Sequence, residues 1–292
     1  MHINDLIIFQ SVAEHSNFTK AAAATHTVQS NVTARIKVLE NEFNTVLFER
    51  RPKKISLTPS GIELLKTTRE ILLLIDQLKK SISDSDQCIK GLIKLGCIHT
   101  TAALRLPGML TAFNEQFPEV DFKLTTGTTA TLISEVLTHK LDGAFIAGPV
   151  DNKHLDSTPI AIENLAVVTS ALTESLDGLL QRKRPLKMIV FSDGCSYRRL
   201  FESFFKTLTT KRLSVIEHDT LEGILNATEA GAGITLLPQD LISKHYRYRA
   251  LRTFPLPKEI SEVTTYFIKR NDTMMSQAYQ TFFESAIAGY KK

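Results

Sequence analysis

The first sixty residues carry apolar side chains at intervals of three and four, which is the spacing of amphipathic helices. Leu6, Phe9 and Val12 predict a first helix over about residues 4 to 15. The four alanines at 21–24 predict a second helix, with Thr19 as its cap. These two segments are short, so neither would be stable without a partner to pack against.

A third helix is predicted from a cap at Thr27 to about Glu42. Its apolar stripe consists of Val32, Ile36, Leu39 and Phe43. The outer end carries small polar side chains, and these are Gln29, Ser30, Asn31 and Thr33. Three short helices with a tight turn before the third indicate a helix-turn-helix, which places the start of its last helix in the DNA major groove. Amides and hydroxyls there can reach base edges.

A basic segment follows the third helix. Arg50, Arg51, Lys53 and Lys54 surround Pro52, and residues 55–57 are predicted to return as a short strand. This pattern is typical of a β-wing whose cations contact DNA phosphates. A small helical bundle with a solvated basic loop is the alternative.

From Ser60 to about Asp86 the chain predicts one long helix, with Gly61 as its only glycine. Apolar or small positions recur at alternating intervals of four and three, which makes a heptad seam. The seam consists of Leu64, Thr68, Ile71, Ile75, Leu78 and Ile82. Packing within the same domain is one interpretation. We favour self-pairing, because a dimer would bring two reading helices onto one pseudo-palindromic DNA site.

Beyond residue 91, short apolar strands alternate with helical segments. Strands are predicted at 91–98, 120–127 and 141–150, and a second set includes 187–192, 213–218 and 233–238. The segment 262–270 can return to the first sheet. Strand–helix–strand spacing predicts parallel sheets with right-handed crossovers, in two α/β lobes with a cleft between them.

Ligands of open α/β sheets bind at the carboxyl ends of strands. The residues at these positions are Thr100, Thr101, Thr128, Thr129, Ala147, Cys195, Ser196 and Tyr197. Hydroxyls at helix starts suit a carboxylate or another small anion. Thr100 and Thr128 could instead be helix caps. Tyr197 and Arg198 could instead anchor the lobes, for example through an Arg198–Glu222 pair.

Composition narrows the class of protein. The chain has 43% hydrophobic and 23% charged residues, and its net charge of +4 permits a polyanionic partner. No apolar run approaches the ~20 residues that span a bilayer, and the N-terminus does not resemble a signal peptide, so we expect a cytoplasmic protein. The eight histidines and three cysteines show no metal-ligand spacing. No catalytic or phosphate-binding motif is present, so we expect neither an enzyme nor a cofactor.

The N-terminal motifs resemble the LysR-type transcriptional regulators of bacteria. The residues that carry the resemblance are Phe18-Thr19, Ala21-Ala22, Gln29, Val32-Thr33, Ile36, Leu39-Glu40, Leu47-Phe48-Glu49-Arg50, Leu57-Thr58-Pro59 and Gly61. The resemblance implies base contacts by Gln29, Ser30, Asn31 and Thr33. It implies backbone or groove contacts by Arg35, Arg50, Arg51 and Lys53. The chain departs from the family at Val28 and Ser30, where Ser-Gln-Pro is usual, and at Ala34, where several members carry a longer polar residue.

The resemblance also covers the remaining chain. Linker helices of the family pair, and family members are known as dimers of dimers. Their two-lobed effector domain is similar to periplasmic solute-binding proteins, and inducers contact the positions of Thr100, Thr128 and 194–197. Cys195 resembles the redox cysteine of the peroxide-sensing branch, although a small residue that lines the cleft is the simpler role.

The expected organisation has three parts. A winged helix-turn-helix occupies 1–58, a dimerisation helix 59–88, and a two-lobed α/β domain 91–292. Lobe I would comprise 91–161 and 266–292, and lobe II 162–265. The expected function is DNA-binding transcriptional regulation controlled by a small, anionic effector. A redox regulator acting through Cys195 and a solute-binding protein are the alternatives.

Overall fold

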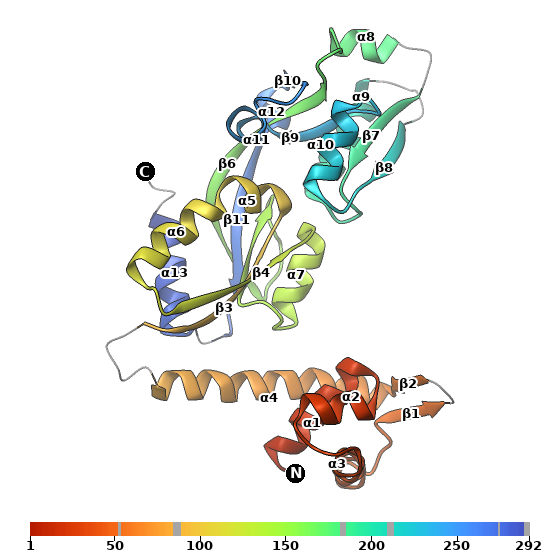
Figure 1. The fold of residues 1–292 in the computed structure, drawn as a ribbon, viewed down its shortest axis with the longest axis vertical. Coiled ribbons are helices and arrows are strands. Elements are labelled where there is room, and N and C mark those ends of the chain that lie inside the picture. Colours follow the sequence, from red (N-terminus) through yellow and green to blue (C-terminus); the bar gives the residue numbers. More distant parts are fainter. Residues whose placement is uncertain (52–53, 84–88, 182–184, 209–212, 274, 289–292) are drawn as a thin grey trace. The chain divides into compact units, whose positions relative to one another are not determined.

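The computed structural model of the protein describes the chain except residues 52–53, 84–88, 182–184, 209–212, 274 and 289–292. The chain divides into two compact units, unit 1 over Met1–Ser85 and unit 2 over Asp86–Lys292. Unit 1 is red to orange in Figure 1, and unit 2 runs from orange to blue. Among the described residues, no helix is long and apolar enough to cross a membrane.

Unit 1 is a three-helix bundle with a β-hairpin and a long helix. Its elements are α1 (Ile3–His15), α2 (Phe18–Ala24), α3 (Gln29–Glu42), β1 (Phe48–Arg51), β2 (Lys54–Leu57) and α4 (Pro59–Ser83). The hairpin strands pair antiparallel, with Phe48 opposite Leu57. The winged helix-turn-helix predicted from the sequence is therefore present.

The core of unit 1 contains the predicted apolar stripes of α1 and α3. Val32, Ile36 and Leu39 are completely buried. The ring of Phe48 lies 5.3 Å from that of Phe9 and 6.0 Å from that of Phe18, measured between centroids. These ring contacts fix the first wing strand to the helices.

The helix starts differ from the prediction. Asn17, not Thr19, caps α2, and its side chain accepts the N–H groups of Thr19 and Lys20. Helix α3 begins after Val28, whose side chain makes no cap bond, and Thr27 instead accepts the side-chain amide of Asn31 at 2.9 Å. Both predicted threonine caps were wrong because Asn17 and Val28 occupy the extended positions that immediately precede the helices.

Helix α4 has two different halves. Leu64 and Ile71 pack against the core of unit 1, and Thr68 between them is fully buried. This part of the predicted seam therefore packs within its own unit. Leu74 and Leu78 are both 59% exposed. Phe43, predicted as part of the α3 stripe, is also exposed, because the helix ends at Glu42 and Phe43 follows as its C-cap residue.

Unit 2 consists of two lobes that share two long strands. Those strands are β6 (Leu155–Ser170) and β11 (Glu262–Arg270). Lobe I contains β3 (Gly91–Cys97), α5 (His99–Leu104), α6 (Leu106–Gln116), β4 (Val120–Thr126), α7 (Thr129–Leu137), β5 (Gly143–Ala147) and α13 (Gln277–Ala288). Lobe II contains α8 (Leu176–Gln181), β7 (Leu186–Val190), α9 (Ser196–Leu208), β8 (Leu213–Glu217), α10 (Leu221–Glu229), β9 (Thr235–Pro238), α11 (Gln239–His245), β10 (Leu251–Pro255) and α12 (Lys258–Ser261).

The main sheet is mixed: the strands of the predicted strand–helix–strand units, β3, β4 and β5, pair in parallel as expected, and antiparallel strands extend the sheet. Its order is β10-β6-β11-β5-β3-β4, with β9 also paired to β6. Only β3, β4 and β5 pair in parallel; β6, β9, β10 and β11 pair antiparallel. A separate parallel pair, β7–β8, belongs to lobe II. Strand β6 pairs with β11 and, in lobe II, with β9 and β10, and β11 pairs with β5 of lobe I, so these two strands connect the lobes.

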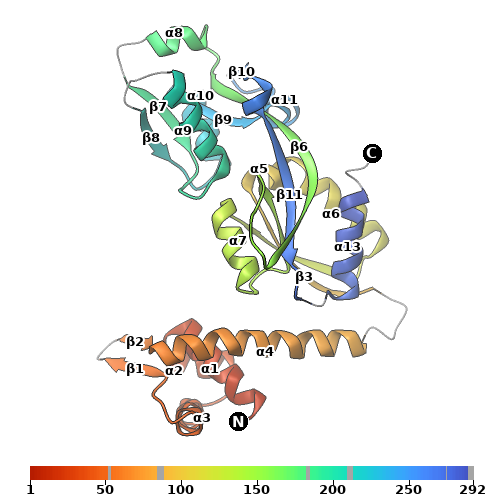
Figure 2. The same cartoon turned by 180° about the vertical axis from the view of Figure 1, so that it is seen from behind.

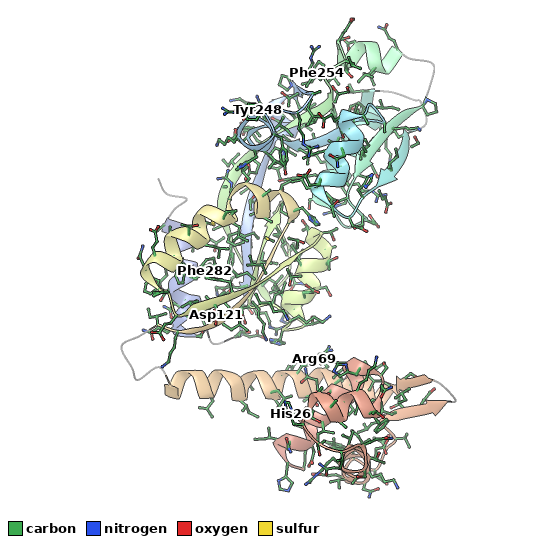
Figure 3. The ribbon with its side chains drawn as sticks, viewed as in Figure 1. His26, Arg69, Asp121, Tyr248, Phe254 and Phe282 are labelled. Atoms are coloured by element: carbon green, nitrogen blue, oxygen red, sulfur yellow. The ribbon has the colours of Figure 1, made fainter. Side chains whose placement is uncertain are left out.

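The helices of lobe I cover both faces of its sheet. Figures 1 and 2 show α6 and α13 on one face and α7 on the other. Phe282, labelled in Figure 3, projects from α13 into the core and contacts the rings of Phe113 and Phe122 at 5.3 and 5.2 Å. The face covered by α7 joins a second core, which continues into lobe II through Val190 and Phe201.

Candidate DNA-reading helix and effector cavity

The exposed start of α3 presents the residues expected to read DNA. Gln29 and Ser30 are exposed, and Asn31 and Thr33 are half-buried. The Thr19 hydroxyl, from α2, donates to Gln29 Oε1 at 3.3 Å. This contact uses the oxygen of the Gln29 amide, whose N–H₂ group is a donor suited to base edges. Because Val28 supplies no side-chain cap, the first N–H groups of α3 receive no side-chain acceptor there, and helix starts of this kind suit phosphate.

Arg35 makes an ion pair within unit 1. Its guanidinium lies 3.3 Å from the carboxylate of Asp5, whose side chain is completely buried in α1. The other Asp5 oxygen accepts the backbone N–H of His2 at 2.7 Å. Arg35, which the family resemblance places against the DNA backbone, therefore also fixes α3 to α1.

The wing residues are only partly described. Arg50 and Arg51 lie on β1, with backbone partners Ile55 and Lys54. Lys53 lies outside the described residues, as do the side chains of Arg50 and Arg51. The same holds for the side chain of Ile82, the last residue of the seam predicted on α4.

A cavity opens between the lobes of unit 2, at the carboxyl ends of β3, β4, β5 and β7. Its cavity volume is about 10 Å³. That space holds about one water molecule, so a larger ligand requires the side chains that line the cavity to move. The lining residues are Ile98, His99, Thr100, Gly127, Thr128, Thr129, Ala147, Phe191, Cys195, Ser196 and Tyr197.

The cavity contains every residue predicted to contact an effector except Thr101. Thr101 is buried, and its carbonyl accepts the N–H of Arg105 at the end of α5. Strand-end reasoning therefore located the cavity. His99, which also lines the cavity, lies at the strand end that this rule identified, after Ile98. Phe191 was not predicted; it follows β7 directly, so the same rule could have included it.

The two lobes touch at Gly194. The N–H of Ala130 donates to the Gly194 carbonyl at 3.3 Å, from α7 in lobe I to the loop before α9 in lobe II. Gly194 has φ 89°, and a Cβ atom there would lie 2.9 Å from the Thr128 hydroxyl. Only glycine fits this close approach without strain.

Two hydroxyls in the cavity wall are buried without a hydrogen-bond partner. They belong to Thr129, at the start of α7, and Tyr197, in the first turn of α9. Thr128 differs, because its hydroxyl caps α7 by accepting the N–H of Thr131. The capping interpretation therefore holds for Thr128, which also lines the cavity. Buried polar groups normally have partners, so the two unpartnered hydroxyls are suited to a ligand.

A buried ion pair lies near Tyr197. Arg105 Nε donates to a carboxylate oxygen of Glu163, which is almost fully buried on the shared strand β6. Burial raises the pKa of the Tyr197 phenol well above its usual value, and the negative charge of Glu163 adds to this effect. Tyr197 is therefore a neutral hydroxyl at neutral pH.

Arg198 does not pair with Glu222, so that expectation was wrong. Arg198 lies 2.9 Å from Glu202 and 2.8 Å from Glu217, whereas Glu222 pairs with Arg249. The i,i+4 spacing of Arg198 and Glu202 on α9 could have indicated the first pair, whereas Glu217 comes from β8 and could not be identified from sequence.

Cys195 lines the cavity as a free thiol. Burial raises its pKa, although the N–H groups of Arg198 and Tyr197 act in the opposite direction. Peroxide reacts with the thiolate, so a raised pKa works against sensing by this residue. Burial likewise raises the pKa of Cys97 to about 11. Cys88 lies outside the described residues. No cluster of three potential metal ligands occurs in the part of the chain that the structure describes.

Comparison with known proteins assigns both units. Residues 3–62 match the bacterial regulatory helix-turn-helix domain of the lysR family, and residues 87–290 match the LysR substrate binding domain. The chain belongs to the LysR family of transcriptional regulators. This LysR-type regulator thus combines a DNA-binding helix-turn-helix with an effector-binding domain, and it belongs with regulators rather than enzymes.

Relatives of the LysR-type regulator match along nearly its whole length. The uncharacterized HTH-type transcriptional regulator YusT of Bacillus subtilis is 39% identical, over 98% of this chain and 95% of the relative. CzcR of Bacillus anthracis is 35% identical, over 98% and 96%. Full-length CbnR complexed with its target DNA has a similar fold, with a TM-score of 0.70, 20% identity and coverage of 99% and 100%.

Proposed function

We propose that this LysR-type regulator is a cytoplasmic, homodimeric protein that reads a pseudo-palindromic DNA site and responds to a small anionic effector. The effector would occupy the cavity between the lobes of unit 2. Two dimers would associate as a tetramer, as the family resemblance implies.

The pair of unpartnered hydroxyls in the cavity carries the effector assignment. Thr129 and Tyr197 offer two donors, and Thr100, Ser196 and Thr128 surround them. The starts of α7 and α9 both lie at the cavity, and helix starts favour negative charge. Among the described lining residues there is no acidic side chain that would repel an anion. These features suit a carboxylate or an inorganic oxyanion.

The effector site can be tested with full-length protein in a thermal-shift screen of organic acids and inorganic anions. We expect at least one to raise the melting temperature. Thr129→Val should reduce the shift several-fold, because it removes a hydroxyl but keeps the side-chain shape. Thr228→Val is the matched control: Thr228 is fully buried, but its hydroxyl donates to the Ile224 carbonyl outside the cavity. A screen without any stabilising anion, or equal loss in both variants, would reject the assignment.

Base reading is proposed for Gln29, Ser30, Asn31 and Thr33, with Arg35 and the wing residues Arg50, Arg51 and Lys53 on the DNA backbone. The CbnR complex supports this proposal at the level of the fold. Gln29→Ala should cost roughly 1–3 kcal/mol of discrimination at one base pair in a competition gel shift. Gln280→Ala, an exposed glutamine of α13, is the control. Uniform weakening on all DNA sequences would contradict base reading by Gln29.

Dimerisation is proposed through the second half of α4. Leu74 is 59% exposed and Ile75 is half-buried, beyond the part of the helix that packs on α1. Leu74→Glu should therefore shift the protein towards monomer in analytical ultracentrifugation. Ile62→Glu is the control, because Ile62 is 60% exposed but lies roughly 120° around the helix from Leu74. If Leu74→Glu sediments like the wild type, this face does not hold the dimer together.

A further inference from the structure

His99 connects the effector cavity to the contact between the lobes. It is the first residue of α5 in lobe I, and its ring lines the cavity. The ring stacks on that of Phe191, which follows β7 in lobe II. The two centroids lie 4.5 Å apart and the planes are inclined by only 8°. A ligand that enters the cavity therefore lies beside an aromatic contact that closes one lobe onto the other.

His99 is the only basic side chain among the described residues that line the cavity. The other lining groups are hydroxyls, apolar side chains, one thiol and one phenol. Burial raises the pKa of the Cys195 thiol and of the Tyr197 phenol, so both are neutral. Histidine is the side chain that changes charge near neutral pH. Any change in the charge of the cavity wall in this range therefore falls on His99.

The surroundings of His99 disfavour its charged form. Burial lowers the pKa of His99, and the negative charge of Asp219 opposes the effect only in part. Several charged groups near α5 already have partners. Lys244 pairs with Asp240 on α11, Arg105 pairs with Glu163, and the Asp193 carboxylate accepts the N–H of Gly194. His218 precedes Asp219 in the chain, His245 is the last residue of α11, and Glu115 lies on α6; both helices pack on α5.

We propose that His99 takes up one proton from solvent when an anionic effector enters the cavity, and that the resulting imidazolium tightens its contact with Phe191. This inference rests on the proposed anion site. An anion in a poorly solvated site favours the charged form of a neighbouring base. A cation over the face of an aromatic ring is attracted by the ring's quadrupole. Effector binding would thus strengthen a contact between the lobes, which is how a ligand can favour one of two arrangements.

The proposal makes two statements about the effector: it carries a negative charge, and its affinity depends on pH. A neutral ligand of the same shape would not charge His99 and would bind independently of pH. For an anion, one proton taken up per site gives an affinity that rises up to tenfold for each pH unit of acidification, between the two values of the His99 pKa.

The test uses full-length protein labelled with ¹³C-histidine, titrated by NMR in the presence of acetate, sulfate or acetamide. The His99→Gln variant assigns the His99 signal. Amide signals of Thr128 and Ser196 report whether each probe enters the cavity. Acetamide matches acetate in shape without its charge. We expect acetate or sulfate to raise the His99 titration midpoint by at least about one pH unit, and acetamide to leave it unchanged.

Three outcomes separate the two hypotheses. If the anions shift the amide signals but leave the His99 midpoint unchanged, proton uptake by His99 is refuted and the anion site stands. If neither anion affects the amide signals, both fail. If binding by His99→Gln keeps the pH dependence of the wild type, His99 is not the responsible group.

Phe191→Leu tests the interlobe contact. It removes the aromatic face but keeps an apolar side chain. We expect the anion to raise the His99 midpoint in this variant by less than in the wild type, because the cation–aromatic attraction is lost. An equal rise would show that the stack on Phe191 does not contribute.

Discussion

The Tyr197 hydroxyl allows an unusual prediction, in which removing a polar group stabilises the protein. Tyr197 is 4% exposed, and its hydroxyl makes no hydrogen bond of ordinary geometry, although the Thr100 hydroxyl lies close enough to lower the pKa of the phenol slightly against the effect of burial. Burying such a group costs about 1–3 kcal/mol relative to leaving it in water. Tyr197→Phe removes this cost but leaves a small void, so we expect a net gain of about 1 kcal/mol. For a unit of about 200 residues, this corresponds to a rise in melting temperature of about 2–4 °C.

Tyr279→Phe is the matched control. Tyr279 is 5% exposed, nearly as buried as Tyr197, but its hydroxyl donates to the Asp142 carbonyl at 2.9 Å. The same chemical change there should destabilise the protein by about 0.5–1.5 kcal/mol, because a hydrogen bond is lost.

Thermal and urea unfolding of full-length protein without effector provide the assay. Opposite signs for the two variants are expected. The best anion from the screen should also stabilise Tyr197→Phe less than it stabilises the wild type, because the ligand loses a donor. If Tyr197→Phe destabilises the ligand-free protein as much as Tyr279→Phe, the Tyr197 hydroxyl is satisfied in the folded state and the reasoning is refuted.

Three further predictions concern other parts of the chain. Gly61→Ala should destabilise unit 1 by about 1–3 kcal/mol in chemical denaturation, because its Cβ would lie 2.2 Å from the Leu47 carbonyl oxygen. Cys195→Ser should leave DNA binding under peroxide the same as in the wild type, because burial raises the thiol pKa; a difference in gel shift would favour the redox alternative. Arg270 lowers the pKa of Asp272, so this carboxylate stabilises the fold above its unfolded pKa and ceases to do so as pH falls through the lower folded value. Asp272→Asn should therefore reduce the loss of stability on acidification below about pH 4, measured by unfolding at several pH values.

The spacing of apolar residues correctly predicted features that are formed within one segment of the chain. The stripe of Val32, Ile36 and Leu39 is buried as its spacing indicated, and β11 has the predicted bounds of 262–270. Strand ends predicted the cavity because parallel strands bring their carboxyl ends to one edge of a sheet.

The remaining features depend on contacts between distant segments. A heptad seam indicates that Leu64 and Ile71 pack against another apolar surface. It does not indicate that this surface belongs to the core of unit 1, which includes residues of α1. Likewise, β6 and β11 were not predicted to pair antiparallel, since periodicity does not specify strand direction. The stack of His99 on Phe191 joins residues from different lobes, so no local signal predicts it.

The shared strands have a consequence for synthesis on the ribosome. Strand β5, near the middle of the chain, pairs on one side with β11, which begins only at Glu262. A nascent chain that ends before this residue lacks the neighbour that completes the sheet of lobe I. Unit 1, by contrast, is built from the first 85 residues alone. We therefore expect the DNA-binding part to fold during translation, whereas the effector domain must await the release of nearly the entire polypeptide.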